Sequence, residues 1–488
     1  MSKLALPVAE LKPALTGLGK VVSKRCTLPV LSHIKIERTK DGWTALTGTD
    51  LDVFITVRLE QPSDGEPISL LVPYDELLKI TKNSQKSDTI LVRSGENSSE
   101  PSVTVEYAIG SQVAEAKLGS LPVEEFPEIP RIKGDPVPVN DSLRESIHEA
   151  FDCASTDETR LVLNSAFIDV SKEDGHYVVG TNGSHLFASN SFKLPLKECL
   201  VLPTHKFFGF KEFNNDGEWQ LKANAANHKD SVLWFQISSR RWRFIGRQID
   251  GTYPNWRQVL PNNSQYETGL QLSDLDALAD AIDRLPDHDV LNHTIGIERQ
   301  QSKVNLLWKP DKEQDWKRLP VTVDQLTGKD ITIYLNRIYL TKALRFGLHR
   351  LDCIDPMSPV RFSHEGRQMI VMPVRAQAAP EKTEAPTAAS QAQETPPEQP
   401  AAPSSTAANE ERTPMVNDTT EPTKSTEPIT IDSIIIDAEA LKTTIQDTLG
   451  EVSVLCKKLK TFQREHKTST KELQSVRQTL KGLQGLKL

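Results

Sequence analysis

The 488-residue sequence contains only five cysteines, and they lie far apart. No two of them form a CxxC pair and none has a histidine at ligand spacing, so the sequence supports neither a zinc site nor a disulfide framework. No metal site is predicted. We expect reduced, mostly buried thiols at Cys26, Cys153, Cys199, Cys353 and Cys456.

Long hydrophobic runs are also missing. No apolar stretch reaches the roughly 18 residues that a membrane-spanning helix needs, and the mean hydropathy is -0.42. The N-terminal stretch MSKLALPVAELKPAL is broken by Glu10 and Lys12, so it does not have the pattern of a signal peptide. We therefore expect a soluble, cytoplasmic protein that does not contact membranes.

Aromatic residues make up only 6% of the chain, and none occurs between residues 376 and 430. That segment is rich in Ala, Pro, Thr, Ser, Gln and Glu, and it cannot bury enough apolar surface to offset the entropy of ordering. Its nine acidic and three basic residues give it a net charge of -6. We predict a disordered, semi-extended linker here.

The formal net charge of the whole chain is -8. Residues 431–488 contribute +3 and residues 1–375 contribute -5. This balance argues against a protein that is basic all over and coats nucleic acid. It is compatible with a basic surface confined to one face.

Residues 1–375 repeat one pattern: a short β-rich run, a proline or capping residue, and then an apolar-periodic stretch that predicts a helix of about 12 to 18 residues. Proline suits the first turn of a helix, and Ser or Asn can cap it. The runs between these stretches, such as HIKIER and HYVVGT, alternate as strands do in antiparallel meanders. The predicted helices open at Pro7, Pro73, Pro138, Pro203, Ser273 and Asn336, at separations near 65 residues.

Six related units of one helix and several strands predict an α+β fold. Turn-rich segments near residues 122–138 and 259–269 divide them into three domains of two similar halves each. The predicted domains are residues 1–130, 131–262 and 263–375, followed by the linker 376–430 and a helical segment 431–488.

Seven segments are spread over residues 1–375: TLPVLSHIKIE (27–37), GTDLDVFITV (48–57), EEFPEIP (124–130), TRLVLNSAFIDV (159–170), VGTNGSHLFAS (179–189), RQIDGTYPNWRQVLP (247–261) and MIVMPVR (369–375). In order and spacing, these segments resemble the bacterial DNA polymerase III beta subunit, the sliding clamp. No single segment is diagnostic, but together they are specific.

The resemblance implies a three-domain sliding-clamp fold and a head-to-tail homodimer, closed into a ring around double-stranded DNA with helices lining the hole. Contacts to phosphates would be electrostatic and independent of sequence, so the ring could slide. The basic residues on or beside the predicted helices are candidates for contact with DNA, and Arg25 matches a family position near the DNA. For each candidate, the alternative is a position on a solvated helix face. The candidates are Lys20, Lys24, Arg25, Lys79, Lys82, Lys86, Arg144, Lys206, Lys211, Arg337, Lys342, Arg345 and Arg350.

The predicted fifth helix fits this arrangement poorly. Its Asp274, Asp276, Asp280 and Asp283 would repel phosphate if they faced the hole. Asp274 and Asp276 could instead stabilise the positive N-terminus of that helix.

The resemblance also implies an apolar pocket for DNA polymerase III and the clamp loader, which would present a short motif with Gln and bulky apolar residues. Ordinary core packing is the alternative for Leu163, Val259 and Met372. Ser184, His185 and Gln258 depart from the family's usual residues, so the preferred motif could differ. The matching positions are Leu163, Thr181, Gly183, Ser184, His185, Leu186, Pro254, Gln258, Val259, Ile370, Met372, Pro373, Val374 and Arg375.

No catalytic constellation emerges. Ser184 and His185 are adjacent and Thr49 precedes Asp50, but no GxSxG elbow is present to position a nucleophile. GTNGSH lacks the Lys-Ser/Thr of a P-loop. The sequence predicts a non-catalytic processivity factor without cofactors.

The tail beyond the linker has heptad spacing. Two seams, from Leu441 to Leu483 and from Ile445 to Lys487, carry ten apolar residues in fourteen positions. This spacing favours a coiled coil or a helical hairpin that binds a partner or self-associates. The alternative to the clamp is therefore a diverged, clamp-like scaffold that acts through this coil without encircling DNA.

Overall fold

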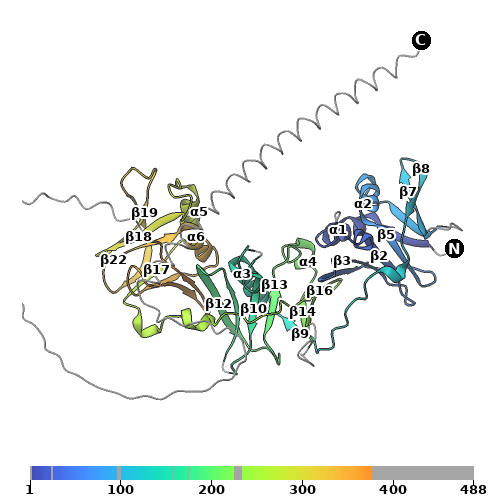
Figure 1. Ribbon diagram of the computed structural model, residues 1–488. Coiled ribbons are helices and arrows are strands. Elements are labelled where there is room, and N and C mark those ends of the chain that lie inside the picture. The colour runs from blue at the N-terminus through green and yellow to red at the C-terminus, as the bar shows by residue number, and fades with distance from the viewer. Residues whose placement is uncertain are drawn as a thin grey trace, which may run out of the picture. The chain divides into compact units, whose positions relative to one another are not determined.

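The computed structural model describes residues 3–23, 26–95, 101–157, 159–173, 175–224 and 233–375, all within one compact unit. The predicted linker and coiled coil lie outside the described residues, as do Cys456, Lys24 and Arg25. The described helices are α1 (Val8–Leu18), α2 (Tyr74–Asn83), α3 (Asp141–Cys153), α4 (Lys211–Asn214), α5 (Leu275–Arg284) and α6 (Arg337–Arg345) (Figure 1).

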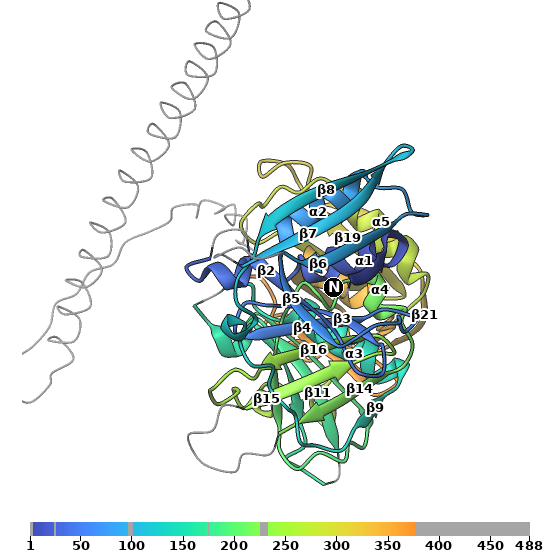
Figure 2. The same cartoon turned by 90° about the vertical axis from the view of Figure 1, so that its right-hand side faces the viewer.

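The strands form four antiparallel sheets, and two of them are four-stranded. The first contains, in spatial order, β1 (Lys3–Pro7), β6 (Thr89–Ser94), β7 (Ser102–Ile109) and β8 (Gln112–Gly119). The second contains β20 (Lys317–Val321), β19 (Lys303–Trp308), β18 (Thr294–Gln300) and β22 (Ile331–Asn336). Figure 2 shows α1 and α2 against the first of these sheets.

The other two sheets are longer. The eight-stranded sheet contains β5 (Ile68–Pro73), β2 (His33–Arg38), β3 (Thr44–Thr49), β4 (Val53–Arg58), β16 (Trp242–Arg247), β15 (Trp234–Ser238), β14 (Trp219–Ala223) and β9 (Val137–Val139). The nine-stranded sheet contains β13 (Leu200–Pro203), β10 (Ser165–Asp169), β11 (His176–Thr181), β12 (His185–Phe192), β25 (Arg367–Val371), β24 (Val360–His364), β23 (Arg350–Cys353), β17 (Thr268–Leu272) and β21 (Val323–Thr327).

Helices begin close to most of the predicted positions. Pro7, Pro73 and Asn336 directly precede α1, α2 and α6, and the side chain of Asn336 accepts a hydrogen bond from Ile338 N. Helix α5 begins at Leu275, two residues after the predicted opening at Ser273. Asn336 caps α6 as expected, and Pro7 and Pro73 bring no N–H to the starts of α1 and α2, whereas Ser273 does not cap α5.

Two helix predictions were wrong. Pro138 lies inside β9, and α3 begins at Asp141, where the Asn140 side chain accepts a hydrogen bond from Leu143 N at 2.9 Å. The helix predicted at Pro203 is absent at that point; turns follow β13, and α4 has only four residues. Phe207, Phe208 and Phe213 are buried there, so the apolar spacing reflects aromatic packing, not a helix face.

Two strand pairs cross the predicted domain boundaries. Strand β4, from the first predicted domain, pairs with β16 from the second, with Ile55 opposite Phe244. Strand β12 pairs with β25 from the third domain, with Phe187 opposite Met369. Both larger sheets are therefore continuous across a predicted boundary.

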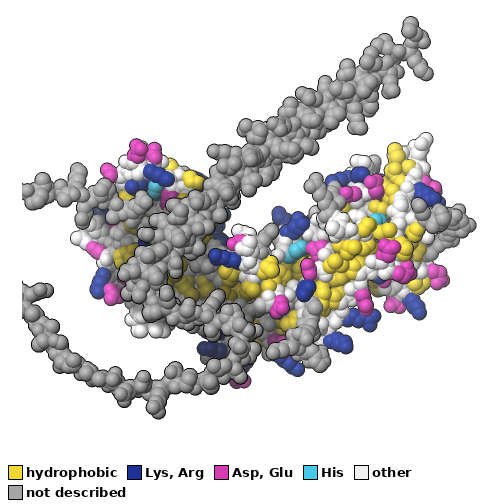
Figure 3. Space-filling model, viewed as in Figure 1, with side chains coloured by type: hydrophobic (Ala, Val, Ile, Leu, Met, Phe, Trp, Pro, Cys, Tyr) yellow, Lys and Arg dark blue, Asp and Glu magenta, His cyan; other side chains and the backbone are white. Residues whose placement is uncertain are grey.

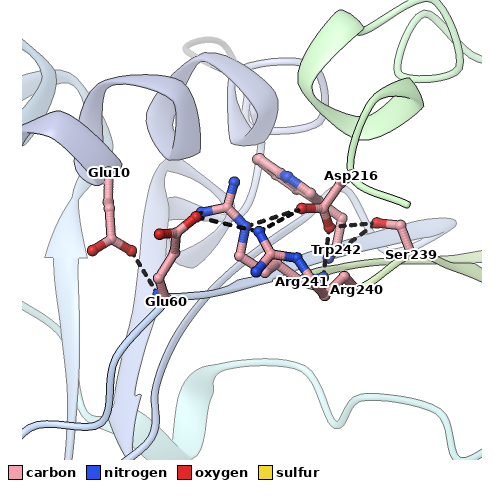
Figure 4. Close-up of polar contacts among 7 residues, drawn as sticks. All are labelled: Glu10, Glu60, Asp216, Ser239, Arg240, Arg241 and Trp242. Atoms are coloured by element: carbon pink, nitrogen blue, oxygen red, sulfur yellow. Dashed lines mark hydrogen bonds and ion pairs between the residues drawn. The ribbon is translucent and has the colours of Figure 1, made fainter. Parts of the chain in front are cut away.

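The β4–β16 junction is reinforced by a polar cluster around the buried Asp216 (Figure 4). Asp216 accepts hydrogen bonds from Ser239 Oγ at 2.8 Å, Arg241 N at 2.6 Å and Arg241 Nε at 3.0 Å. Arg241 Nη1 also lies 3.1 Å from Glu60 Oε1, and Glu10 of α1 accepts a hydrogen bond from Glu60 N. The cluster thus connects residues on both sides of the junction.

Close packing fixes the same junction. A Cβ added at Gly17 of α1 would lie 2.4 Å from a ring carbon of Trp242, and that ring is itself buried. The absence of a side chain at position 17 therefore lets α1 approach β16 closely.

Candidate functional site

The basic residues proposed to face DNA are mostly exposed and come from several elements. On the face drawn in Figure 3, Lys and Arg side chains form separate small groups with Asp and Glu between them. Lys79, Lys82, Lys86, Lys206, Lys211 and Arg345 are exposed, whereas Lys20, Arg144 and Lys342 are half-buried.

The charges of Lys20 and Lys206 both act on His205. The imidazole of His205 is half-buried, and its pKa is lowered to about 4 by burial and by the charges of Lys206 and Lys20. Two candidates that are far apart in sequence therefore contribute to the electrostatics of the same ring.

Other candidates are partly neutralised. Lys79 Nζ lies 2.7 Å from Glu76 Oε1, and Arg144 Nη2 lies 2.7 Å from Asp141 Oδ1. Arg144 also donates to Asn214 O at 3.1 Å, so it helps to hold α4 against α3.

A basic residue of α6 neutralises part of the acidic charge of α5. Arg345 Nη2 lies 2.5 Å from Asp283 Oδ2, which joins the two helices by an exposed ion pair. Asp276 lies in the first turn of α5, as expected from the helix dipole, and Asp274 is its N-cap residue in the left-handed conformation. Asp280 remains exposed.

Two predicted DNA contacts have other positions. Arg337 donates to the carbonyl oxygens of Ile282, Leu285 and Pro286, so its guanidinium satisfies the C-terminal end of α5. Arg350 does not lie on a helix lining a hole, because it begins β23. Both residues have structural partners that the one-dimensional charge pattern does not reveal.

The residues of the predicted partner pocket gather around an apolar cluster on one face of the nine-stranded sheet. Along β12 and β25, Phe187 and Met369 point into the main core, whereas the neighbouring pair Leu186 and Ile370 points to the opposite face. The cluster contains Val179, Leu186, Ala188, Tyr253, Trp256 and Ile370. Only Leu186 and Ile370 of these were predicted site residues.

The turn between β11 and β12 joins this cluster to the end of β25. Thr181 Oγ1 donates to His185 O, and Gly183 N donates to Thr181 Oγ1 at 3.1 Å. Met372 N donates to Ser184 O at 3.0 Å, which brings the MIVMPVR segment beside the turn. Gly183 has a φ of 92°, a conformation that glycine adopts without strain.

The exposed rim of the cluster has the character expected of a binding surface. The side chains of Val259 and Met372 are 40% and 44% exposed, and those of Pro254, Gln258 and Arg375 are also exposed. Leu163, Pro373 and Val374 are half-buried, and Val374 N donates to Tyr334 O. Among the predicted residues, Leu186 and Ile370 lie in the buried cluster and Met372 lies beside the turn at Ser184, whereas none of the described contacts joins Leu163 or Arg375 to the cluster.

The loop that carries Pro254, Gln258 and Val259 is held by a residue that sequence reasoning missed. Asp169, at the end of β10, is only 2% exposed and accepts a hydrogen bond from Trp256 Nε1 at 2.8 Å. It also pairs with Arg257, whose guanidinium lies over the rings of Trp256 and Tyr177. Two aromatic residues three positions apart in a turn-rich segment, Tyr253 and Trp256, were the available signal.

His185 does not take part in a catalytic pair with Ser184. Its ring is buried against Tyr339, with centroids 4.1 Å apart, and burial together with the charge of Lys342 lowers its pKa to about 3. Neither ring nitrogen has a hydrogen-bond partner among the described residues. The ring is a neutral packing element between β12 and α6.

Metal and thiol chemistry find no support in the described part of the chain. No group of three or more His, Cys, Asp or Glu side chains within it could hold a metal ion. Cys153 and Cys353 are buried, and burial raises the pKa of each thiol to about 12. Cys26 and Cys199 are half-buried, and all four are free.

Among the described residues, no helix has the length and apolarity needed to cross a membrane.

Comparison with known proteins places the fold. Residues 4–130 match the family model described as the DNA polymerase III beta subunit, N-terminal domain. The sliding clamp (DNA polymerase III subunit beta) from Pseudomonas aeruginosa superimposes with a TM-score of 0.66 at 21% identity, covering 77% of this chain and all of that one. The fold is that of a beta sliding clamp.

Curated relatives agree. The beta sliding clamp of Bacillus subtilis is 24% identical over 361 residues, which is 70% of this chain and 90% of that protein. The beta sliding clamp of Pseudomonas putida is 24% identical over 346 residues. The predicted resemblance to sliding clamps is thereby confirmed for the core, and the predicted DNA and partner residues remain predictions.

Proposed function

We propose that this protein is a non-catalytic DNA sliding clamp, a ring of two chains that encircles duplex DNA and tethers a polymerase and other partners. The observation that carries the proposal is the clamp fold over the whole length of solved sliding clamps. A tethered polymerase rebinds its template at high effective concentration, so the clamp needs no catalytic residue.

The order of strands suggests how two chains close the ring. At each of the two junctions, the strand at the end of one group of strands pairs antiparallel with the strand at the end of a group from the following domain. These pairs are β4 with β16 and β12 with β25. The corresponding strands that have no such partner are β20 and β8, each an edge of its sheet among the described strands. Antiparallel pairing of β20 with β8 of a second chain would continue the pattern head to tail.

For DNA, we propose that Lys20, Lys79, Lys82, Lys86, Arg144, Lys206 and Arg345, together with Lys24 and Arg25, contact phosphates. The positive charges of Lys20 and Lys206, which both lower the pKa of His205, support this assignment. Such contacts are independent of base sequence and weaken as salt rises, because bound counterions are released.

For partners, we propose that the cluster around Leu186 and Ile370 accepts the bulky apolar residues of a short linear motif. Gln258 and Arg375 are exposed at its rim and can donate hydrogen bonds to the carbonyl oxygens of a bound peptide. Polymerase and clamp loader would share this surface.

The proposed ring is tested by the mass of the full chain in solution. We expect light scattering to give the mass of two 54.4-kDa chains. Lys117→Pro removes a main-chain donor from β8 and should shift the equilibrium toward the monomer, because sheet edges pair through main-chain hydrogen bonds. Lys117→Ala is the matched control and should remain dimeric. A wild-type chain that is monomeric at every concentration would contradict the proposed ring.

A further inference from the structure

A groove of about 650 Å³ adjoins the candidate partner surface on the nine-stranded sheet. Its lining includes Leu260, Gln271, Arg350, Ser363 and Gln368. Leu260 also packs against the apolar cluster that contains Leu186 and Ile370. The groove therefore begins where the apolar surface ends.

A row of side chains crosses the sheet in register and forms the floor of the groove. Ala188, which belongs to the apolar cluster, lies opposite Gln368 of β25, and Gln368 lies opposite Ser363 of β24. Ser363 in turn lies opposite Arg350 of β23, and Arg350 lies opposite Gln271 of β17. Directly opposite residues share one face of an antiparallel sheet. The polar row, which consists of Gln368, Ser363, Arg350 and Gln271, thus leads out of the apolar cluster on the same face.

The polar row has hydrogen-bonding groups that the described part of the chain does not use. Gln271, Ser363 and Gln368 are half-buried, and their side chains make no hydrogen bond to another described residue. The side chain of Arg350 is 46% exposed, and among the described residues only its Nε has a partner, Asp352 Oδ1 at 2.8 Å. Gln and Ser side chains both donate and accept, and a guanidinium donates. All four residues are therefore available to a polar ligand.

The charges in and around the groove do not select an acidic ligand. Three guanidinium groups and four carboxylates lie there: Arg350, Arg361 and Arg367 against Asp352, Glu365, Glu149 and Glu145. Asp352 is 2% exposed and lies 2.8 Å from both Arg350 Nε and Arg361 Nη2. Glu145 and Glu365 are exposed, so water and salt screen their charges. The free hydrogen-bonding groups, and not a net charge, distinguish this groove.

We propose that the groove is a second subsite of the partner surface and binds about four uncharged polar residues that flank the bulky apolar residues of a partner's motif. The inference rests on the partner surface proposed above. Continuity favours a flank of the same peptide over a separate ligand, because Ala188 of the cluster and Gln368 of the groove are direct cross-strand neighbours. Main-chain amides and the side chains of Ser, Thr, Asn or Gln would pair with the polar row.

The length of the polar row sets the length of the flank. Neighbouring antiparallel strands lie about 4.8 Å apart, so the row from Gln368 to Gln271 crosses three such spacings, or about 14 Å. An extended peptide covers about 3.4 Å per residue, so about four residues span the row. A motif seated on Leu186 and Ile370 would bring its flank directly to Gln368.

The test compares peptides that share one motif of Gln and bulky apolar residues, with affinities for the full chain measured by fluorescence anisotropy. The reference peptide carries four Gly and Ala residues on each side of the motif, and the probe carries four Ser and Gln residues there. We expect the probe to bind about fivefold more tightly, because each added hydrogen bond contributes only modestly. This gain should change little with salt, and flanks of Glu or of Lys should bind no more tightly than the reference.

Variants of the polar row locate the gain. Gln271→Ala combined with Ser363→Ala should reduce the ratio of the two affinities from about five to near one. Gln220→Ala is the matched control and should preserve the ratio, because Gln220 is exposed on β14 of the other long sheet. Circular dichroism confirms that each variant is folded.

Three results would overturn the proposed subsite while leaving the partner surface intact. They are equal affinities of probe and reference, tighter binding of a charged flank than of the probe, and an unchanged ratio in the double variant. If the reference peptide and the probe both fail to bind the wild-type chain, the partner surface and the subsite are both wrong.

Discussion

Asp169 accepts a hydrogen bond from the indole nitrogen of Trp256 at 2.8 Å, and this contact fixes the loop that presents Gln258 and Val259. The carboxylate is almost fully buried and also accepts hydrogen bonds from Ser171 N and Ser171 Oγ. Burial alone would raise the pKa of Asp169, but the hydrogen bonds from Ser171, Trp256 and Arg257 hold that pKa below its ordinary value. The loop is thus attached to the sheet through a charged group.

Asp169→Asn is expected to weaken binding of a Gln-containing apolar peptide about tenfold while the chain still folds. The amide keeps the size of the side chain but removes the charge that pairs with Arg257, so the loop loses its fixed position. Fluorescence anisotropy gives the peptide affinity, and thermal unfolding monitored by circular dichroism gives the fold. Asp355→Asn is the control, because Asp355 is exposed and bonds only to its own turn. Equal affinity of both variants would contradict the positioning role.

The buried cluster at the β4–β16 junction predicts a large loss of stability for Asp216→Ala. Removing this carboxylate leaves Arg241 N, Arg241 Nε and Ser239 Oγ without their acceptor, and breaking a buried pair costs about 3 kcal/mol. Urea unfolding measures the change in free energy. Asp52→Ala should change it by less than about 0.5 kcal/mol, because Asp52 is 74% exposed and lies 3.7 Å from Arg247. Similar losses for both variants would show that the cluster does not stabilise the junction.

The burial of the Glu149 carboxyl group predicts a dependence of stability on pH. Burial, reinforced by Glu145 and Asp152 and opposed by Arg367, raises the pKa of Glu149 from 4.5 to about 7. Between these two values the folded chain binds more protons than the unfolded chain. The contribution of Glu149 to stability is therefore present below pH 4.5 and is lost as the pH rises toward 7.

Glu149→Gln should remove that part of the pH dependence. We expect the urea midpoint of the wild type to fall more between about pH 5 and about pH 8 than that of the variant. Asp141→Asn is the matched control on the same helix, since its side chain is 94% exposed and its charge is not a cause of the raised pKa of Glu149. Parallel pH profiles for wild type and Glu149→Gln would contradict the raised pKa.

Much of the fold was predictable because local signals and tertiary structure agree. Prolines and Asn336 mark helix starts by local chemistry, and strands such as β2 alternate between buried and half-buried residues. The failures have tertiary causes. The aromatic residues around Phe207 have helical spacing, but they pack against Trp242 and Phe244 without forming a long helix.

The candidate sites were predictable in part for similar reasons. The turn at Gly183 and the MIVMPVR segment matched a family pattern, and the structure brings them together through Met372 N and Ser184 O. The role of Arg337 at the end of α5 and that of Asp169 beneath the Trp256 loop depend on contacts between residues distant in sequence. Residue type and spacing do not specify such contacts.

The central claim is that two chains close around DNA, and retention on DNA of different topology tests it most directly. The full chain is loaded by a bacterial clamp loader onto closed circular DNA and onto the same DNA made linear, and the bound protein is measured after gel filtration in salt that suppresses electrostatic binding. The account predicts retention on the circle and loss from the free ends of the linear form. Equal retention on both, or on neither, would contradict it and favour a clamp-like scaffold that does not encircle DNA.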